Sequence, residues 1–408
     1  MADDNSLHVS RHFLDRQAQK VRFIPFAEAG PAEDAAPGTM LAHRLFVTGG
    51  WRQELKQHIV SIADLELKTV PAQELVLSAD KQVLTDFSHK GRVTALQVKQ
   101  WGDGNVMVVI GSANGGISRM RFKVPLGPGS ALAEIQMVDM DSDTHEGCLT
   151  VWQQCHTDNV AAVDINTDKQ QVLTAGIDGQ LHLLPMQWEQ GSEAWTSHDT
   201  CYSDESGYVS YYDAQWASID TFVTASTTGG LQVWDVRKKS CRQSDLKWGM
   251  TGVSADIGKG TARQIHSIAT HPSQPDKCAS GASNGTVAVW DMRFTSAPLV
   301  ASTGKQNAGD VWQVQFDADY EPGPAQTPPV MFCTDDGLLC RANWAARADA
   351  PLTHMQLNAQ QRLSSTPEVS TLLSEASSIN GFDVDGSEIV AVVEQECMCY
   401  IKRRSQAF

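Results

Sequence analysis

Stretches in which apolar and polar residues alternate recur along the whole chain, and many are followed by a turn containing glycine. Alternation with a period of two is typical of a β-strand with one buried face. The recurring unit is a strand, a tight turn and a second strand, which in some copies ends in Trp-Asp. Its two clearest copies, which align without gaps, are Phe222–Arg237 and Cys278–Arg293. Self-similarity of this kind predicts an all-β repeat protein.

Three weaker copies keep the turn or its spacing: Val108–Arg119, Val172–Leu184 and Met331–Cys340. The turn glycines of the five copies are Gly116, Gly179, Gly230, Gly285 and Gly337. They are 63, 51, 55 and 52 residues apart, somewhat more than the about 40 to 45 residues of a minimal propeller blade. A further β-type run precedes each turn and supplies the innermost strand of a blade. We expect the extra residues to form loops.

A degenerate unit precedes the five copies and another follows them, so the chain is predicted to form one seven-bladed β-propeller of the WD-repeat type over residues 1–408. The predicted blades span about 20–80, 90–140, 158–198, 207–247, 263–303, 309–358 and 377–402, the last together with 7–14. The last unit is one strand short, and the segment 7–14 has no unit of its own. We expect this segment to pair into the last blade, because that removes an open strand edge.

The signature residues of the repeat have structural explanations. Glycine preceded by Asp or Asn turns the chain cheaply between antiparallel strands. Trp234 and Trp290 are predicted to fill space between neighbouring blades. Asp235 and Asp291, which follow them, are predicted to accept local hydrogen bonds. The turn aspartates in the same signature are Asp178 and Asp336.

Some WD repeats contain a hydrogen-bonded network of His, Ser or Thr, Asp and Trp. The third blade carries a partial set in His156, Thr174 and Asp178, but Leu184 replaces the Trp. No blade shows the full set, so the repeats are degenerate.

Composition and charge limit the possible functions. The chain has 41% hydrophobic and 20% charged residues, with 31 Gly and 16 Pro, as expected for a folded protein rich in turns. Its net charge of −16 disfavours direct binding to nucleic acid or anionic lipid. The first residues do not resemble a secretory signal, and no apolar run is long enough to span a bilayer. We therefore expect an intracellular protein without membrane insertion. Nine cysteines without a CxxC pair predict reduced, mostly buried thiols.

Motifs that suggest chemistry are explained by the repeat or are incomplete. Gly281–Gly285 fits the GxSxG pattern around Ser283, but that motif needs a strand-to-helix elbow, and here a hairpin is predicted. The loop 252–260 lacks the first Gly and the Ser or Thr of a phosphate-binding loop, since Val253 and Gly260 stand at those positions. The segment 139–150 lacks the Gly and the acidic residue of a calcium loop. The histidines have no metal-site spacing. We therefore predict no enzyme activity, cofactor, metal or small-molecule substrate.

Four stretches resemble one family of propellers, the forty-three-kilodalton WD-repeat nucleoporins of the Y-shaped outer-ring scaffold of the nuclear pore. They are Val9–Arg11 followed by Lys20–Phe23, His89–Val93, His271–Pro275 through Arg293, and Asp310–Phe316. The resemblance implies a peripheral propeller docked on an α-helical scaffold nucleoporin. It implies a location in the nucleus, at the nuclear pore complex of the nuclear envelope, and a contribution to pore assembly and to transport of mRNA and protein. A kinetochore role known for animal members is not carried over.

In this interpretation the loops and faces of the propeller bind partners, and the inserted segments 123–150, 247–262 and 317–329 enlarge that surface. An alternative is a substrate receptor of a cullin-type ubiquitin ligase, because the motifs ending at Arg237 and Arg293 match the WDxR element of such adaptors. That element is common in ordinary propellers. A hydrolase that uses Ser283 is a third hypothesis.

Overall fold

In the computed structural model of the protein, every regular element of the described residues is a β-strand. The described ranges are 7–31, 39–70, 75–102, 104–124, 136–137, 148–149, 151–186, 201–203, 207–227, 230–238, 242–247, 264–283, 285–293, 298–302, 309–317, 327–344 and 367–403. Within them, no helix is long and apolar enough to cross a bilayer. The chain divides into two compact units, residues 1–155 with 380–408, and residues 156–379.

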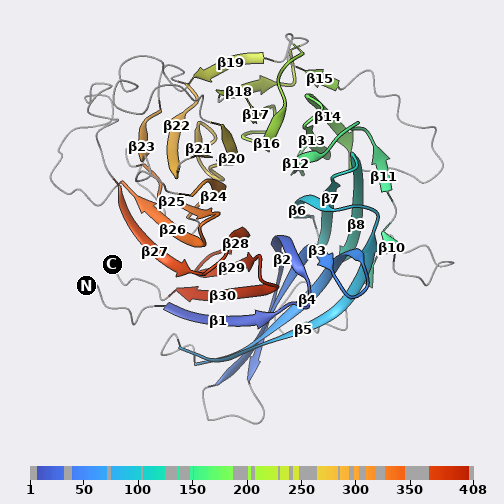
Figure 1. The fold of residues 1–408 in the computed structure, drawn as a ribbon, viewed down its shortest axis with the longest axis vertical. Helices are drawn as coiled ribbons and strands as arrows, with labels where there is room; N and C mark the ends of the chain where they lie inside the picture. Colours follow the sequence, from blue (N-terminus) through green and yellow to red (C-terminus); the bar gives the residue numbers. More distant parts are fainter. Residues whose placement is uncertain are drawn as a thin grey trace. The chain divides into compact units, whose positions relative to one another are not determined.

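The first unit contains three sheets, which we number as blades 7, 1 and 2 (Figure 1). Blade 7 has the order β1 (Leu7–Phe13), β30 (Cys397–Arg403), β29 (Glu388–Val393), β28 (Ile379–Asp385). Blade 1 has the order β10 (Cys148–Leu149), β5 (Leu75–His89), β4 (Gln57–Val70), β3 (Met40–Arg52), β2 (Gln17–Pro31). Blade 2 has the order β11 (Val151–Gln154), β8 (Gly116–Lys123), β7 (Asn105–Ser112), β6 (Val93–Trp101), and β9 (Gln136–Met137) also pairs with β8.

The second unit contains four antiparallel sheets, blades 3 to 6, each formed by four strands in chain order. Blade 3 contains β12 (Val160–Asn166), β13 (Gln171–Gly176), β14 (Gln180–Pro185) and β15 (Cys201–Ser203). Blade 4 contains β16 (Tyr211–Trp216), β17 (Thr221–Ser226), β18 (Gly230–Asp235) and β19 (Arg242–Lys247). Blade 5 contains β20 (Ile265–Thr270), β21 (Lys277–Ala282), β22 (Thr286–Asp291) and β23 (Val300–Ser302). Blade 6 contains β24 (Val311–Phe316), β25 (Val330–Thr334), β26 (Leu338–Asn343) and β27 (Glu368–Ser374).

Within each unit, neighbouring sheets pack through their apolar faces. Val47 and Val60 of blade 1 share a buried cluster with Val108 of blade 2. In the second unit, Leu183 of blade 3 packs in one cluster with Trp234 of blade 4. The second and third strands of the blades are buried on both faces, which explains why their sequences are nearly continuous apolar runs. These features confirm the predicted fold class, an all-β, seven-bladed WD-repeat β-propeller.

The segment at the start of the chain completes the last blade, as predicted. β1 pairs antiparallel with β30 from Leu7 opposite Arg403 to Phe13 opposite Cys397. The backbone N–H of Leu14 then donates to the carbonyl of Glu396 at 2.8 Å. Figure 1 shows β1 lying along β30, with the start of β1 and the end of β30 at the same end of this sheet.

The first two blades extend beyond the ranges expected from the sequence. The sequence predicts blade 1 at about 20–80, but β2 begins at Gln17 and β5 continues to His89. The sequence predicts blade 2 at about 90–140, but its outer strand β11 follows at Val151–Gln154. The strands β2 to β5 are 13 to 15 residues long, and β11 is too short to show alternation. Most residues of the inserts at 247–262 and 317–329 lie outside the described part.

We predict that deleting residues 1–13 lowers the free energy of unfolding by more than about 3 kcal/mol, because several strand-pairing hydrogen bonds are lost at roughly 1 kcal/mol each. The exposed edge of β30 should also promote association between molecules. Urea denaturation measures the first effect and light scattering the second. Phe13→Ala is the control, since this side chain is 67% exposed. A deletion variant as stable as the control would contradict closure by β1.

Candidate functional site

The two tryptophans of the Trp-Asp motifs are structural side chains. Trp290 is fully buried, and its Nε1 donates to Oγ of Ser280 at 2.9 Å. Trp234 makes the equivalent bond to Oγ1 of Thr224 at 3.0 Å. Its ring also lies parallel to that of Phe222, with centroids 5.8 Å apart. Each tryptophan joins the third strand of its blade to the second and leaves no polar atom for a ligand.

The aspartates that follow the tryptophans hold the arginines of the same motifs. In blade 5, Asp291 accepts bonds from Nε and Nη2 of Arg293 at 2.9 and 2.7 Å, and from Nζ of Lys277 at 3.0 Å. Burial alone would raise the pKa of Asp291, but the bonds from Arg293 and Lys277 outweigh it and lower the pKa to about 2. In blade 4, Arg237 binds Asp235 in the same bidentate way and holds its pKa well below the ordinary value.

The partial network in blade 3 is formed by the residues singled out from the sequence. Nδ1 of His156 lies 3.0 Å from Oδ1 of Asp178, and Nε2 lies 2.9 Å from Oγ1 of Thr174. Asp178 also accepts the backbone N–H of Thr157 at 2.9 Å. Leu184 lies two residues after His182 on β14, where blades 4 and 5 carry Trp. The network therefore joins the entry of blade 3 to its turn without a Trp.

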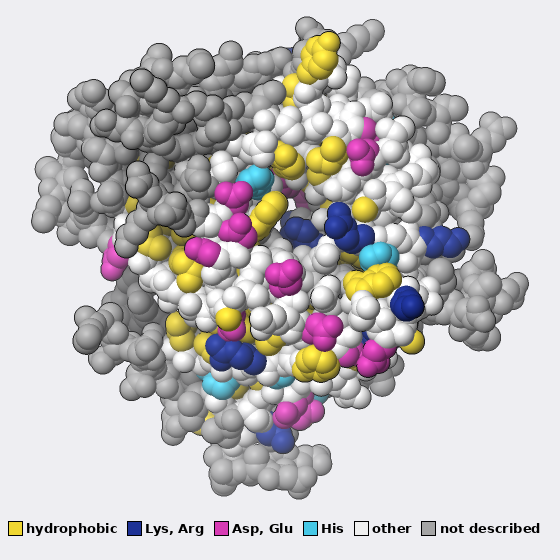
Figure 2. All heavy atoms as spheres, viewed as in Figure 1, with side chains coloured by type: hydrophobic (Ala, Val, Ile, Leu, Met, Phe, Trp, Pro, Cys, Tyr) yellow, Lys and Arg dark blue, Asp and Glu magenta, His cyan; other side chains and the backbone are white. Residues whose placement is uncertain are grey.

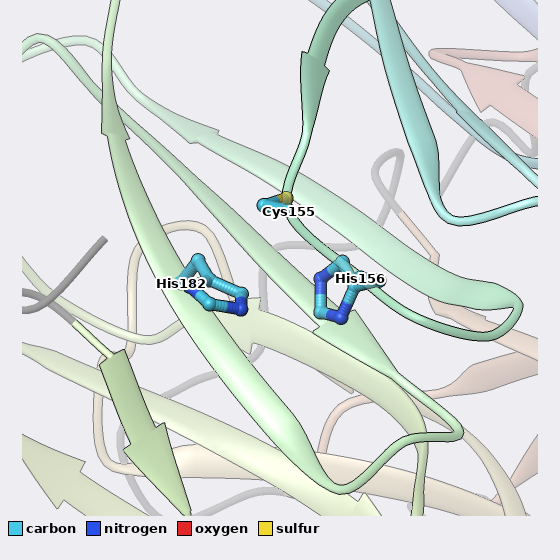
Figure 3. A group of neighbouring side chains, drawn as sticks. All are labelled: Cys155, His156 and His182. Carbon is cyan, nitrogen blue, oxygen red and sulfur yellow. The ribbon is translucent and has the colours of Figure 1, made fainter. Parts of the chain in front are cut away.

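Cys155, His156 and His182 form the group of described residues that could hold a metal ion, with ligand atoms within 4.8 Å of one another (Figure 3). The two imidazole rings meet edge to face with centroids 4.8 Å apart. Both ring nitrogens of His156 already lie within hydrogen-bonding distance of Asp178 and Thr174. A metal would have to displace one of those bonds, so the donor set fits a hydrogen-bonded network better than a metal site.

The turn residues occupy different positions around their hairpins. Gly179, Gly285 and Gly337 have positive φ angles of 79°, 65° and 86°. In blade 2 the positive φ belongs to Gly115, at 83°, and Gly116 begins β8. Gly230 begins β18, and the two residues before it lie outside the described part. Asp336 accepts hydrogen bonds from the hydroxyl of Thr334 and the backbone N–H of Gly309.

The motifs that suggested enzyme chemistry do not assemble a site among the described residues. Ser283 lies between the antiparallel strands β21 and β22, and its N–H donates to the carbonyl of Gln264 at 3.0 Å. A hydrolase elbow requires a helix after the strand. The segments 252–260 and 139–143 lie outside the described part of the chain.

Sequence reasoning missed hydrogen bonds that join the innermost strands of neighbouring blades. In the second unit, carboxylate or hydroxyl oxygens of one innermost strand accept backbone N–H groups of the next. The pairs are Asp164 with Trp216 at 2.8 Å, Asp213 with Ile268 at 2.8 Å, and Ser267 with Val314 at 3.1 Å. The available signal was a polar residue inside an otherwise apolar strand, which by itself does not identify a partner.

Two ionic clusters in the first unit were also missed. Glu388 of blade 7 binds Nε of Arg44 from blade 1 and Nζ of Lys402, the latter at 2.8 Å. Burial favours a raised pKa for Glu388, but the two cations outweigh it and lower the pKa below its ordinary value. Arg16, whose side chain is 1% exposed, binds Asp86 at 3.0 Å. The partners are far apart in the chain, so no local pattern marks them.

The seven sheets, together with the buried Trp-Asp motifs, define a WD-repeat β-propeller protein whose described residues assemble no catalytic constellation. No protein-family model matches the chain. The chain is 25% identical to nuclear pore complex protein NUP43 of Arabidopsis thaliana over 98% of both chains. It is 21% identical to human nucleoporin Nup43 over 96% of this chain and 97% of that protein. It is also 21% identical to mouse nucleoporin Nup43, over 83% of this chain and 76% of that protein. The comparisons confirm the resemblance to Nup43-type nucleoporins.

We predict that Trp290→Ala lowers the free energy of unfolding by about 3 to 5 kcal/mol, because it removes a buried ring and leaves a cavity. Trp290→Phe should cost less, about 1 to 2 kcal/mol, since a ring remains but Ser280 loses its donor. Urea denaturation measures both values. Trp312→Ala is the matched control, because Trp312 is 44% exposed. Equal effects at the two tryptophans would show that Trp290 is not part of the core.

We predict that Asp291→Asn lowers the free energy of unfolding by about 2 kcal/mol near neutral pH. This is the contribution of a carboxyl group whose pKa is lowered to about 2 when the protein folds. The folded pKa is lower than the unfolded one, so this contribution is complete above the unfolded pKa and disappears as pH falls through the folded pKa. The difference between wild type and variant should therefore shrink between about pH 4 and about pH 2. Denaturation at several pH values measures it, with the exposed Glu368→Gln as control. A difference that stays constant with pH would contradict the ion pair.

Proposed function

We propose that this protein is a non-enzymatic scaffold subunit in the outer ring of the nuclear pore complex, where it supports pore assembly and transport of mRNA and protein. The observation that carries the proposal is the end-to-end similarity to Nup43 nucleoporins on a propeller fold. The similarity indicates the nuclear pore complex, at the nuclear envelope, as the location of the protein. A propeller suits this role because it offers loops, strand edges and broad faces to partners.

A non-enzymatic role is supported by how the conspicuous polar residues are used. The Trp-Asp motifs and the network around His156 bind partners within their own blades. Catalysis would need a nucleophile, a base and a stabilising donor that converge on one position. In the described part of the chain, the candidate nucleophile Ser283 lies in a hairpin that the repeat itself explains.

The partners that we propose are α-helical scaffold nucleoporins of the Y-shaped complex. The net charge of −16 disfavours direct contact with nucleic acid, whose phosphates are also negative. The proposal includes no small-molecule substrate, cofactor or membrane insertion.

The ubiquitin-ligase alternative is not favoured by any observation. Arg237 and Arg293, which would contact the ligase adaptor, are held by Asp235 and Asp291 of their own motifs. Such local pairing accounts for the WDxR pattern without a partner.

Localisation and affinity purification of the tagged full-length protein test the proposal. We expect fluorescence at the nuclear rim and co-purification of helical scaffold nucleoporins, both unchanged by Arg237→Ala or Arg293→Ala because these arginines serve local pairs. Diffuse fluorescence without recovery of nucleoporins would overturn the proposal. Recovery of a ligase adaptor, lost in either arginine variant, would instead support the alternative.

A further inference from the structure

The innermost strands of the second unit each carry a β-bulge after their first residue. The register with the second strand skips one residue after Tyr211 in β16, after Ile265 in β20 and after Val311 in β24. The extra residues in these three strands are Tyr212, His266 and Trp312, and β12 has the same bulge with Ala161 as its extra residue. A bulge re-aims its extra side chain relative to the regular alternation of the strand, and bulges are frequent beside functional sites. Three successive blades therefore present a ring at the same structural position.

These three rings form a continuous aromatic row. The centroids of Tyr212 and His266 are 5.4 Å apart, and those of His266 and Trp312 are 4.9 Å apart. Trp312 is 44% exposed although it is a large hydrophobic residue. The side chain of His266 is only 7% exposed, yet neither of its ring nitrogens makes a hydrogen bond among the described residues. A buried ring without hydrogen bonds is costly unless something else stabilises it.

Carboxylates lie beside the aromatic row. Oδ2 of Asp310 is 3.5 Å from Nε2 of His266, and the carbonyl of Asp310 accepts the backbone N–H of Asp335 at 3.1 Å. Asp335 is exposed and forms no ion pair with a Lys or Arg in the described ranges. Burial lowers the pKa of His266 despite these carboxylates, so its ring is uncharged near neutral pH. In Figure 2, hydrophobic, acidic and histidine side chains gather side by side over β20 and β24.

We propose that the aromatic row binds an arginine side chain from an extended, basic segment of a partner protein. A guanidinium plane stacks on aromatic faces while its N–H groups pair with carboxylates, and this surface offers both. An acidic segment would be repelled by the carboxylates of Asp310 and Asp335, and a purely apolar segment would leave the exposed Asp335 without a cation. The binding does not rest on the proposed role at the nuclear pore, because it is a property of the isolated chain.

The test is fluorescence anisotropy of the full-length protein with a fluorescein-labelled Gly/Ser peptide that carries arginines. We expect saturable binding, and no binding of the same peptide with glutamate in place of arginine. Trp312→Ala, and separately Asp310→Asn with Asp335→Asn, should each weaken binding about tenfold. Trp312→Phe keeps a ring and should weaken it less than about threefold.

Matched controls come from β27, the outer strand of the same blade. Val369→Ala removes an apolar side chain that is 48% exposed, and Glu368→Gln removes an exposed charge. Both should bind the arginine peptide like wild type, and melting curves verify that every variant is folded. The proposal is overturned if wild type does not bind the arginine peptide, if the glutamate peptide binds equally, or if folded Trp312→Ala keeps full affinity. An equal loss of peptide affinity in the two β27 variants would also overturn it. Such a loss would show that the arginine peptide is attracted by the net negative charge of the protein and not by the aromatic row.

Discussion

Each innermost strand has a neighbour on only one side of its own sheet, so the N–H groups along its other edge need acceptors from elsewhere. In the second unit the preceding innermost strand supplies them. Gln215 accepts the N–H of Thr270 at 3.1 Å, one blade after Asp164 accepts that of Trp216 at the equivalent position. In the first unit, Asp383 accepts the N–H of Phe23 at 2.8 Å. A buried N–H left unpaired costs roughly 1 to 3 kcal/mol, so these side chains link the strands of successive sheets energetically.

The first unit meets the same constraint with charged groups as well. Glu388 lies on β29, where a buried carboxylate is stable only when paired. Arg44 from blade 1 and Lys402 from β30 supply the two cations. This pairing connects the end of the chain to a strand that lies more than 340 residues earlier in the sequence. Pairing of β1 with β30 also stabilises the last blade. The ion pairs neutralise the buried carboxylate of Glu388, and the strand pairing covers the open edge of β30.

The sequence predicted the features that depend on local chemistry. Turns with Gly179 or Gly337 and buried strands such as β22, which contains Trp290, have recognisable local patterns, and the unpaired segment at the start implied closure. Outer strands such as β11 and β23 were not predicted, because three or four residues are too few to show the alternation of apolar and polar positions. The side chains that accept N–H groups of the innermost strands were not predicted for another reason. A polar residue such as Asp164 can be assigned to an N–H group some 50 positions away only when the packing of the blades is known.

The innermost strands also explain where a propeller of this type can vary its surface. The residue before each bulge in the second unit is fully buried, as Val160, Tyr211, Ile265 and Val311 show. The residue after the bulge can be needed as an acceptor, as Asp213 is. The bulge residue itself has no partner in the register with the second strand, so pairing does not fix its side chain. Strand pairing therefore constrains side chains less at that position than at its neighbours, which makes it a place where the surface of the blades can differ.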